Sequence, residues 1–384
     1  MFLTGLRCLR CNTRVAPDLD AYLCPRCGDG GDGDPGILDA EYDYDGVREA
    51  VREGSGWLRG SPTLFRYLPL LPVDAPGPGL PAGGTPLVPA PRLARRLGLR
   101  ALYLKDETRN PTRCLKDRAT AIAVTLALAQ GRRDVYCASA GNAAISLAGF
   151  AAHLEMPCHV FVPRRASPER LRWLSGYGAD VHVSTGDYDQ AFAESEEQGR
   201  NEGWYSRNCA FNPFLVEGKK TAAFEIAESL DWAVPDLVVA PVGDGCTLSA
   251  QGKGFRELRE LGLTERIPRL LGVQAEGVQP LVRRAASDSG ARPSEVGSTR
   301  AASIDVKRPR NALRLLHELQ ESGGSMNAVP DDEIGEAEVE LARDAGMVAE
   351  FTSAATLAGL RRHLEEVGSE GETAVLLITG GRSG

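Results

Sequence analysis

Short apolar runs of strand length alternate with longer amphipathic runs of helical spacing along most of this chain. Residues 159–162 and 181–183 have the composition of buried strands, whereas residues 168–176 and 188–201 have helical spacing. Such alternation is typical of parallel strands joined by crossover helices. The sequence therefore predicts an α/β fold with parallel or mixed sheets flanked by helices. At 384 residues, the chain is long enough for two domains and a small extra module.

One lysine stands at a predicted strand-to-helix junction. Residues 101–105 are predicted as a strand, 110–112 as a turn and 119–129 as an apolar helix, which Lys116 opens. A deprotonated lysine amine forms a Schiff base with an aldehyde, and burial and the helix dipole both disfavour its charged form. Lys116 is therefore a candidate catalytic residue. The alternative interpretation is a solvated surface lysine.

A second strand–turn–helix segment carries an asparagine. Residues 135–138 are predicted as a strand, Gly141 and Asn142 as a tight turn, and 143–153 as a helix. An asparagine at such a turn can hydrogen-bond a ring hydroxyl of a cofactor. The alternative interpretation is an asparagine that caps its own helix.

A glycine-rich turn follows the predicted strand 237–240. Backbone N–H groups of such a turn, placed ahead of a helix, bind phosphate. The turn lacks the third glycine of the dinucleotide fingerprint and the Gly-Lys-Ser/Thr of the nucleotide P-loop. Its members are Gly243, Asp244, Gly245, Cys246 and Thr247.

A hydroxyl follows the last predicted strand, residues 375–378, at Thr379. A threonine hydroxyl is a neutral partner for a pyridine nitrogen, which suits elimination and replacement chemistry. The alternative interpretation is a polar chain end. Lysine, asparagine, phosphate turn and hydroxyl, in this order, predict a site for pyridoxal 5'-phosphate (PLP).

These segments together resemble threonine synthase and its relatives in the tryptophan-synthase-β class of PLP enzymes, which have fold type II. The resemblance runs from about residue 80 to the end of the chain, and in weaker form from residue 8. It rests on several ordered segments, which are far more specific together than any one alone. They are Gly83-Gly84-Thr85-Pro86-Leu87, Asn110-Pro111-Thr112-x-x-x-Lys116-Asp117-Arg118, Ser139-Ala140-Gly141-Asn142, residues 217–222, 243–247 and 350–356, and Thr379.

The resemblance implies a role for each cofactor residue. Lys116 is expected to form the Schiff base and then to act as general base and acid at the substrate Cα. Asn142 is expected to bind the ring hydroxyl, Gly243 to Thr247 the cofactor phosphate, and Thr379 the ring nitrogen. The resemblance also implies an amino-acid substrate and a homodimer.

The expected substrate pocket departs from the family's pattern at three positions. Ser139, Ala140 and Gly141 are expected to line the carboxylate pocket, but Ala140 stands where the family usually offers a hydroxyl. Arg113 belongs to a segment that is usually Gly-Ser-Phe, and it is expected near the substrate's anionic end. Leu215 stands where many threonine synthases have a phosphate-binding arginine. Loss of such a buried arginine costs about 2–5 kcal/mol, which is enough to change substrate preference.

The sequence thus predicts a threonine synthase-like lyase that acts on an activated, O-phosphorylated amino acid. O-phosphohomoserine, converted to threonine and phosphate, is the first candidate substrate. The alternatives are β-replacement or β-elimination on O-phosphoserine or a related amino acid, and a non-catalytic regulatory protein that binds PLP and zinc.

Four of the nine cysteines form two Cys-x-x-Cys pairs, Cys8 with Cys11 and Cys24 with Cys27. Their spacing fits a four-thiolate zinc ribbon, with a disulfide pair as the alternative. The remaining cysteines are scattered, which fits a reducing cytosol. Many threonine synthase-like proteins carry a similar ribbon, followed by a strand like residues 38–44. The sequence therefore predicts a closed, structural zinc site.

The predicted domains follow from these segments and from the family's fold. Residues 1–36 are expected to form the zinc ribbon, 37–125 with 221–384 the larger PLP-binding domain, and 126–220 a smaller inserted domain. Stretches rich in Gly, Pro or polar residues are expected to be linkers or loops; they are residues 28–36, 74–84 and 285–299.

Composition narrows the class of protein further. A hydrophobic content of 42% and a charged content of 25% are those of an ordinary globular protein. A net charge of −8 disfavours a nucleic-acid surface. No apolar run is long enough to span a bilayer, and residues 1–6 are too short for a signal peptide. The expectation is a cytoplasmic enzyme with no nucleic-acid or membrane partner.

Overall fold

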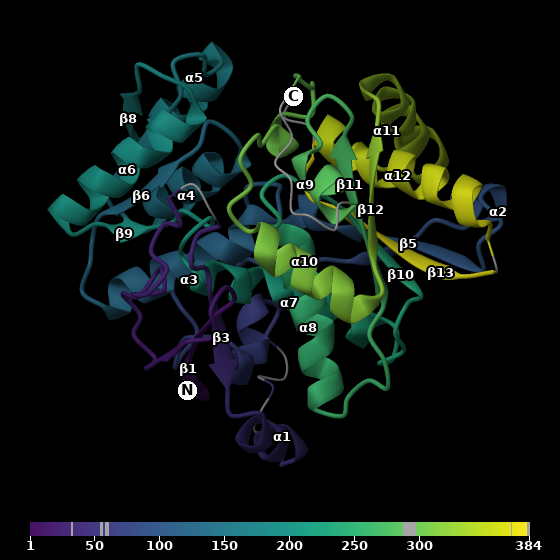
Figure 1. Ribbon diagram of the computed structural model, residues 1–384, viewed down its shortest axis with the longest axis horizontal. Coiled ribbons are helices and arrows are strands. Elements are labelled where there is room, and N and C mark those ends of the chain that lie inside the picture. Colours follow the sequence, from purple (N-terminus) through teal and green to yellow (C-terminus); the bar gives the residue numbers. More distant parts are fainter. Residues whose placement is uncertain (32–33, 54–56, 58–60, 287–296, 370, 382–384) are drawn as a thin grey trace. The chain divides into compact units, whose positions relative to one another are not determined.

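The computed structural model describes residues 1–31, 34–53, 57, 61–286, 297–369 and 371–381 (Figure 1). The chain divides into two compact units. The first comprises Met1–Gly30, Pro35–Gly84 and Asn110–Lys219, and the second comprises Gly31–Asp34, Thr85–Arg109 and Lys220–Gly384. The first unit groups the cysteine segment with the predicted smaller domain, 126–220, and with part of the predicted larger one. The division into a ribbon and two domains therefore stays a prediction.

The first unit contains two sheets. A three-stranded antiparallel sheet has the order β2-β1-β3, and a four-stranded parallel sheet has the order β8-β7-β6-β9. Its strands are β1 (Leu3–Cys8), β2 (Arg14–Val15), β3 (Leu38–Tyr42), β6 (Val135–Ala138), β7 (Cys158–Val162), β8 (Asp180–Val183) and β9 (Tyr205–Ser206). Its helices are α1 (Tyr44–Arg52), the 3-10 helix η1 (Leu64–Leu70), α3 (Lys116–Ala129), α4 (Asn142–His153), α5 (Pro168–Gly176) and α6 (Tyr188–Glu202).

The second unit is built on a six-stranded mixed sheet of order β12-β11-β10-β13-β5-β4, in which only the edge strand β4 runs antiparallel to its neighbour. Its strands are β4 (Leu87–Pro89), β5 (Ala101–Asp106), β10 (Leu237–Pro241), β11 (Arg269–Ala275), β12 (Ser325–Val329) and β13 (Thr373–Ile378). Its helices are α2 (Pro91–Arg96), η2 (Glu107–Arg109), α8 (Cys246–Glu260), α9 (Pro280–Ala285), η3 (Ala302–Ile304), α10 (Ala312–Ser322), α11 (Asp331–Ala345) and α12 (Phe351–Val367), and α7 (Phe214–Ser229) runs from the first unit into the second.

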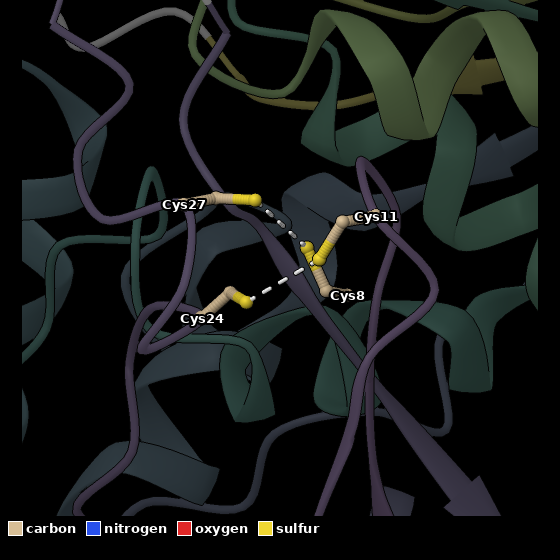
Figure 2. Close-up of side chains that lie close together, drawn as sticks. All are labelled: Cys8, Cys11, Cys24 and Cys27. Carbon is tan, nitrogen blue, oxygen red and sulfur yellow. Dashed lines mark hydrogen bonds between the residues drawn. The ribbon is translucent and has the colours of Figure 1, made fainter.

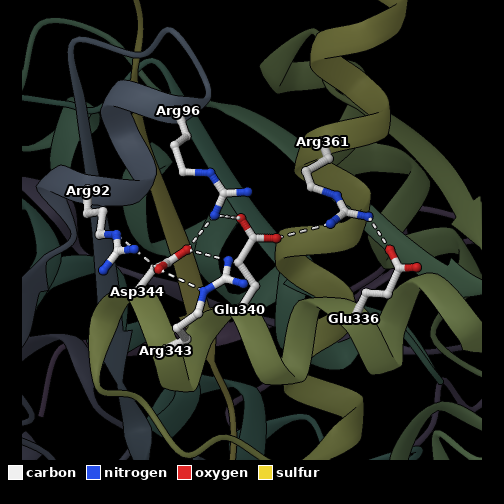
Figure 3. A network of polar contacts seen from close by, with 7 residues as sticks. All are labelled: Arg92, Arg96, Glu336, Glu340, Arg343, Asp344 and Arg361. Atoms are coloured by element: carbon white, nitrogen blue, oxygen red, sulfur yellow. Dashed lines mark hydrogen bonds and ion pairs between the residues drawn. The ribbon is translucent and has the colours of Figure 1, made fainter.

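Apolar packing and a polar network hold helices α2, α11 and α12 around the larger sheet. Strand residues such as Leu104 and Leu376 pack in one buried cluster with helix residues such as Leu341 and Leu357. Arginines and carboxylates then connect the three helices, as Figure 3 shows. Arg92 lies 3.1 Å from Asp344, and Glu340 pairs with Arg96 and Arg361 at 3.0 Å each. Glu340 of α11 thus pairs with one arginine of α2 and one of α12, and such a network stabilises more than an isolated surface pair.

Most predicted elements are confirmed. Each predicted strand lies within an observed one, except that the strand predicted at 38–44 ends at Tyr42, because Asp43 accepts a hydrogen bond from Gly46 and caps α1. Residues 74–84 form no helix or strand, as expected. Within the predicted linkers, residues 32–33 and 287–296 lie outside the described residues. Across the described part of the chain, no helix is both long and apolar enough for a membrane span.

Candidate active site

Lys116 opens α3 directly after the turn that the sequence predicts. The Arg113 N–H donates to the Asn110 carbonyl at 2.8 Å and closes this turn. Asp117 is buried, and it accepts hydrogen bonds from the Thr112 backbone N–H, at 2.6 Å, and from the Thr112 hydroxyl. Burial raises the pKa of Asp117, and these hydrogen bonds oppose that rise. Hydrogen bonds therefore fix the loop both within the turn, between Arg113 and Asn110, and between the turn and helix α3, through Thr112 and Asp117.

The surroundings of the Lys116 amine lower its pKa. Burial, reinforced by the positive charges of Lys219 and Arg207, lowers the pKa of Lys116 to about 8. Arg207 donates to the Lys116 carbonyl and to the Thr120 hydroxyl, each at 3.1 Å. Lys219 Nζ lies 2.8 Å from Cys209 Sγ. An amine that deprotonates near neutral pH suits both nucleophilic attack and proton transfer, whereas the alternative, a solvated lysine, would keep its ordinary pKa.

The asparagine loop lies against the lysine loop within the first unit. The Cys114 thiol donates to the Asn142 carbonyl at 3.8 Å. Helix α4, which Asn142 opens, approaches the same loop at Gly149, where an added Cβ would lie 2.9 Å from Thr112 Cγ2. The helix can come this close because Gly149 has no side chain. The structure thus brings Lys116 and Asn142 into one neighbourhood.

The turn before α4 supplies polar groups from its backbone. Gly141 is the N-cap of α4, and its N–H donates to Ser139 Oγ at 3.0 Å. Asn142 is the first helical residue, so the alternative of an asparagine at the N-cap is not what the structure shows. Ala140 adds no side-chain hydrogen-bonding group. A carboxylate held here would therefore be bound by backbone N–H groups at the helix N-terminus.

The glycine-rich turn lies in the second unit, between β10 and α8. Gly245 is the N-cap of α8 with φ of 99°, a left-handed conformation that favours glycine. An added Cβ on Gly245 would lie 2.9 Å from the Asn311 carbonyl oxygen. The sequence from Gly243 through Cys246 to Thr247 thus forms the predicted backbone turn at a helix N-terminus.

The Asp244 carboxylate faces a neighbouring loop. It accepts hydrogen bonds from the Arg310 N–H at 2.6 Å and from the Asn311 side chain at 2.9 Å. A carboxylate repels a phosphate, so only the backbone of Asp244 suits the predicted phosphate role. Its side chain instead connects the turn to residues 310–311.

Thr379 follows β13 and is joined to the start of α12. Its hydroxyl lies 3.0 Å from Ser353 Oγ, which also donates to the Gly380 carbonyl at 3.1 Å and accepts from the Gly380 N–H at 2.9 Å. Sequence reasoning missed Ser353, although its segment, residues 350–356, carries part of the resemblance. Both hydroxyls are uncharged, and the role of Thr379 as partner of a ring nitrogen stays a prediction.

Two further cations were missed by sequence reasoning. Arg207 and Lys219 are only 2% and 1% exposed, and both act electrostatically on Lys116. Lys219 lies in the segment 217–222, which the resemblance marks without assigning it a role. Arg207 directly follows β9 and has no local signal in the sequence.

The positions that depart from the family's pattern differ in exposure. Arg113 is exposed, and its φ of 63° is left-handed, which is uncommon for a non-glycine residue. Leu215 is fully buried in the first turn of α7. It therefore contributes packing and no charge.

The four cysteines of the N-terminal segment come together in the first unit, as Figure 2 shows. Their sulfur atoms all lie within 4.8 Å of one another, with Cys8 and Cys27 at 4.0 Å and Cys11 and Cys24 at 3.7 Å. All four are free thiols, so the alternative of a disulfide pair is not what the structure shows. Sulfurs bound to one tetrahedral zinc at about 2.3 Å would be about 3.8 Å apart, which fits this cluster.

The residues of each unit fit PLP. The first unit supplies an amine of lowered pKa beside an asparagine. The second supplies a turn without room for a side chain at Gly245 and a neutral hydroxyl pair. These are the groups needed for an aldehyde, a phosphate and an uncharged ring nitrogen.

Comparison with known proteins agrees with this chemistry. The family model described as "Pyridoxal-phosphate dependent enzyme" matches residues 79–380. A threonine synthase of Methanosarcina acetivorans is 37% identical over 98% of this chain and 91% of its own length. One from Methanocaldococcus jannaschii is 37% identical with the same coverage. Among solved structures, threonine deaminase isoform 2 from Solanum lycopersicum has a TM-score of 0.66 at 23% identity, covering 78% of this chain and 84% of that one, which shows the shared fold.

The match spans both compact units, and the 37% identity to the threonine synthases exceeds the 23% identity to the solved structure that shows the shared fold. The non-catalytic alternative is therefore set aside. This chain belongs to the pyridoxal-phosphate-dependent enzymes of fold type II, and it is a threonine synthase-like PLP-dependent lyase.

Proposed function

We propose that the protein is a threonine synthase, which converts O-phosphohomoserine and water to threonine and phosphate. The observation that carries the proposal is the similarity to a threonine synthase along 98% of this chain, because it includes the cysteine segment as well as the PLP-binding motifs. We further propose that one PLP is held by Lys116, Asn142, the backbone of residues 243–247 and Thr379. An assay that detects threonine and phosphate from O-phosphohomoserine tests the proposal.

The chain's own residues account for the proton transfers. When bound, PLP supplies an electron sink for the electrons released at the substrate's α-carbon. The Lys116 amine, with its pKa near 8, can remove the proton at Cα and return it later. Asn142 and Thr379 orient the ring without adding charge. The loop of Ser139, Ala140 and Gly141 holds the substrate carboxylate at the N-terminus of α4.

Buried positive charge supports an anionic substrate. Arg207 and Lys219 are buried close enough to Lys116 to lower its pKa. Buried cations stabilise a phosphate or carboxylate more strongly than exposed ones, because the local dielectric is low. These two residues are therefore our candidates for binding the substrate's anionic groups, and the exposed Arg113 remains a further candidate from the sequence alone.

The reaction of Lys116 with PLP should depend on pH. The free amine is the nucleophile, and the charged amine predominates below the pKa of about 8. The rate of PLP uptake by the cofactor-free protein should therefore rise from pH 7 to pH 9 and level off above. Stopped-flow absorbance at constant ionic strength measures this rate. A rate that keeps rising to pH 10.5 would show a lysine with an ordinary pKa and contradict the assignment.

The phosphate turn can be tested at Gly245. Gly245→Ala should weaken PLP binding at least ten-fold, because the new Cβ meets the Asn311 carbonyl and the backbone loses its left-handed freedom. Gly262→Ala is the matched control, since Gly262 also has a left-handed φ but no atom within 4 Å of an added Cβ. Equilibrium dialysis with PLP measures both. Equal effects of the two substitutions would contradict a phosphate role for this turn.

A second candidate function is β-replacement or β-elimination on O-phosphoserine. The buried, uncharged Leu215 favours it, because many threonine synthases have a phosphate-binding arginine at this position. Under this alternative, the enzyme would release phosphate from O-phosphoserine but not from O-phosphohomoserine.

We propose that the cysteine cluster binds one structural zinc ion. Cys24→Ser should lose that zinc and destabilise the first unit, because structural zinc binding contributes directly to folding. Cys137→Ala, which removes a buried thiol outside the cluster, is the control and should retain the metal. Elemental analysis and thermal unfolding measure the two effects. Retention of full zinc content by Cys24→Ser would contradict the site.

We also propose a homodimer, which the family resemblance implies and which sedimentation velocity tests.

A further inference from the structure

Two histidines and an aspartate meet across neighbouring strands of the parallel sheet in the first unit. His159 on β7 is the register partner of Asp180 on β8, and His182 lies two residues further along β8. His159 Nδ1 lies 3.5 Å from Asp180 Oδ2 and 3.5 Å from His182 Nε2. His182 Nε2 lies 3.2 Å from the same Asp180 oxygen. Two nitrogens and one oxygen therefore form a nearly equilateral triangle.

The size of this triangle matches the coordination sphere of a transition metal. Metal–nitrogen and metal–oxygen bonds at zinc-type sites are about 2.0–2.1 Å long. At that length, donor atoms 3.2–3.5 Å apart subtend about 100–120° at the ion, close to the tetrahedral angle. Calcium and magnesium prefer oxygen ligands, whereas two imidazoles and a carboxylate are typical of zinc, copper, iron or nickel.

A second carboxylate orients one of the ligands. His159 Nε2 lies 3.3 Å from Asp134 Oδ1. A histidine that binds metal through one ring nitrogen usually donates the other N–H to a carboxylate, which fixes its tautomer and raises its basicity. Asp134 belongs to the loop before β6, so it approaches His159 from the side opposite β8. This outer contact is independent of the ligand triangle and supports the same role.

Aromatic stacking fixes the two rings. The His159 ring stacks on Trp204 with centroids 3.6 Å apart, and the His182 ring stacks on Phe161 at 4.5 Å. The imidazoles are thus held in orientation before any ion arrives, which is what a preformed site needs. The Asp180 side chain is 66% exposed, so the triangle is open to solvent on one side.

We propose that His159, Asp180 and His182 form a binding site for a divalent transition metal of the zinc class, with water in the remaining position. The site is separate in sequence and structure from the four cysteines and from Lys116. The ion would join β7 to the edge strand β8. The proposed metal site is independent of which amino acid the enzyme uses as substrate.

Zinc content of the full-length, PLP-loaded protein tests the proposal. After dialysis against micromolar zinc and gel filtration, the wild type should hold two zinc ions per chain, one at the cysteines and one at the histidines. His182→Ala and Asp180→Asn should each hold one. His153→Ala, which removes an exposed histidine from α4 of the same unit, should still hold two. Retained visible absorbance of bound PLP shows that each variant is folded.

Two further variants separate this site from the cysteine cluster. Cys24→Ser should keep one zinc, and that zinc should be lost in the double variant with His182→Ala.

Asp134→Ala should bind the second zinc at least ten-fold more weakly, since loss of the outer carboxylate weakens metal affinity 10–100-fold. A wild type that holds a single zinc, or a second zinc that survives both His182→Ala and Asp180→Asn, would overturn the proposal. In that case the triangle is a hydrogen-bonded cluster without metal.

Discussion

Lys116→Ala should lower turnover by about 10⁴-fold, the upper range for loss of a positioned general acid–base group. In the proposed function the amine also anchors the cofactor, so the visible absorption band of lysine-bound PLP should disappear. The expectation follows from position and charge: Lys116 opens α3 beside the asparagine loop, and burial with two neighbouring cations lowers its pKa to about 8. Steady-state kinetics and an absorbance spectrum measure the two effects.

The control for this substitution is Lys307→Ala. Lys307 is an exposed lysine in the second unit, so its removal should leave turnover and spectrum within two-fold of the wild type. Exogenous methylamine should partly rescue Lys116→Ala by replacing the missing amine. A Lys116→Ala protein that keeps both its absorption band and its turnover would show that another lysine is the catalytic one.

Glu225→Ala should destabilise the second unit by about 3–5 kcal/mol, the usual cost of breaking a buried ion pair. Lys105 Nζ lies 2.6 Å from a Glu225 carboxylate oxygen, and the two side chains are 0% and 4% exposed. Lys105 also donates to the Thr85 carbonyl. The substitution would leave a buried ammonium without its partner carboxylate. Chemical denaturation of the PLP-free protein measures the loss.

A surface pair and a double variant make the stability test specific. Glu336→Ala removes the exposed partner of Arg361 in the same unit, and should cost less than about 1 kcal/mol. The apolar double variant Lys105→Met with Glu225→Leu should recover much of the loss, because it leaves no buried charge. Equal destabilisation by Glu225→Ala and Glu336→Ala would contradict a structural role for the buried pair.

Local signals were sufficient to predict the elements that position the candidate site. The helix at Lys116 is recognisable because alanine-rich sequence follows a Pro-containing turn. The turn at Gly245 is recognisable because glycine precedes a helix at the end of an apolar strand. Each of these signals spans only about ten consecutive residues, so it can be read from the sequence without knowledge of the tertiary structure.

The electrostatic surroundings of the lysine could not be predicted in this way. Arg207 and Lys219 are about ninety and one hundred residues beyond Lys116 in the sequence, and only the folding of the first unit brings them to it. The same holds for His159, Asp180 and His182, which become neighbours through the register of β7 and β8. No spacing rule connects such positions, because their separation depends on the lengths of the intervening helix and loops.

The central claim, threonine synthase activity, is tested most directly by incubating the purified, PLP-loaded protein with O-phosphohomoserine and measuring threonine and phosphate in the same samples. Both products should appear in equal amounts, Lys116→Ala should form neither, and O-phosphoserine should be a poor substrate. Phosphate release from O-phosphoserine with no threonine from O-phosphohomoserine would contradict the claim and place the enzyme among the β-replacement or β-elimination enzymes.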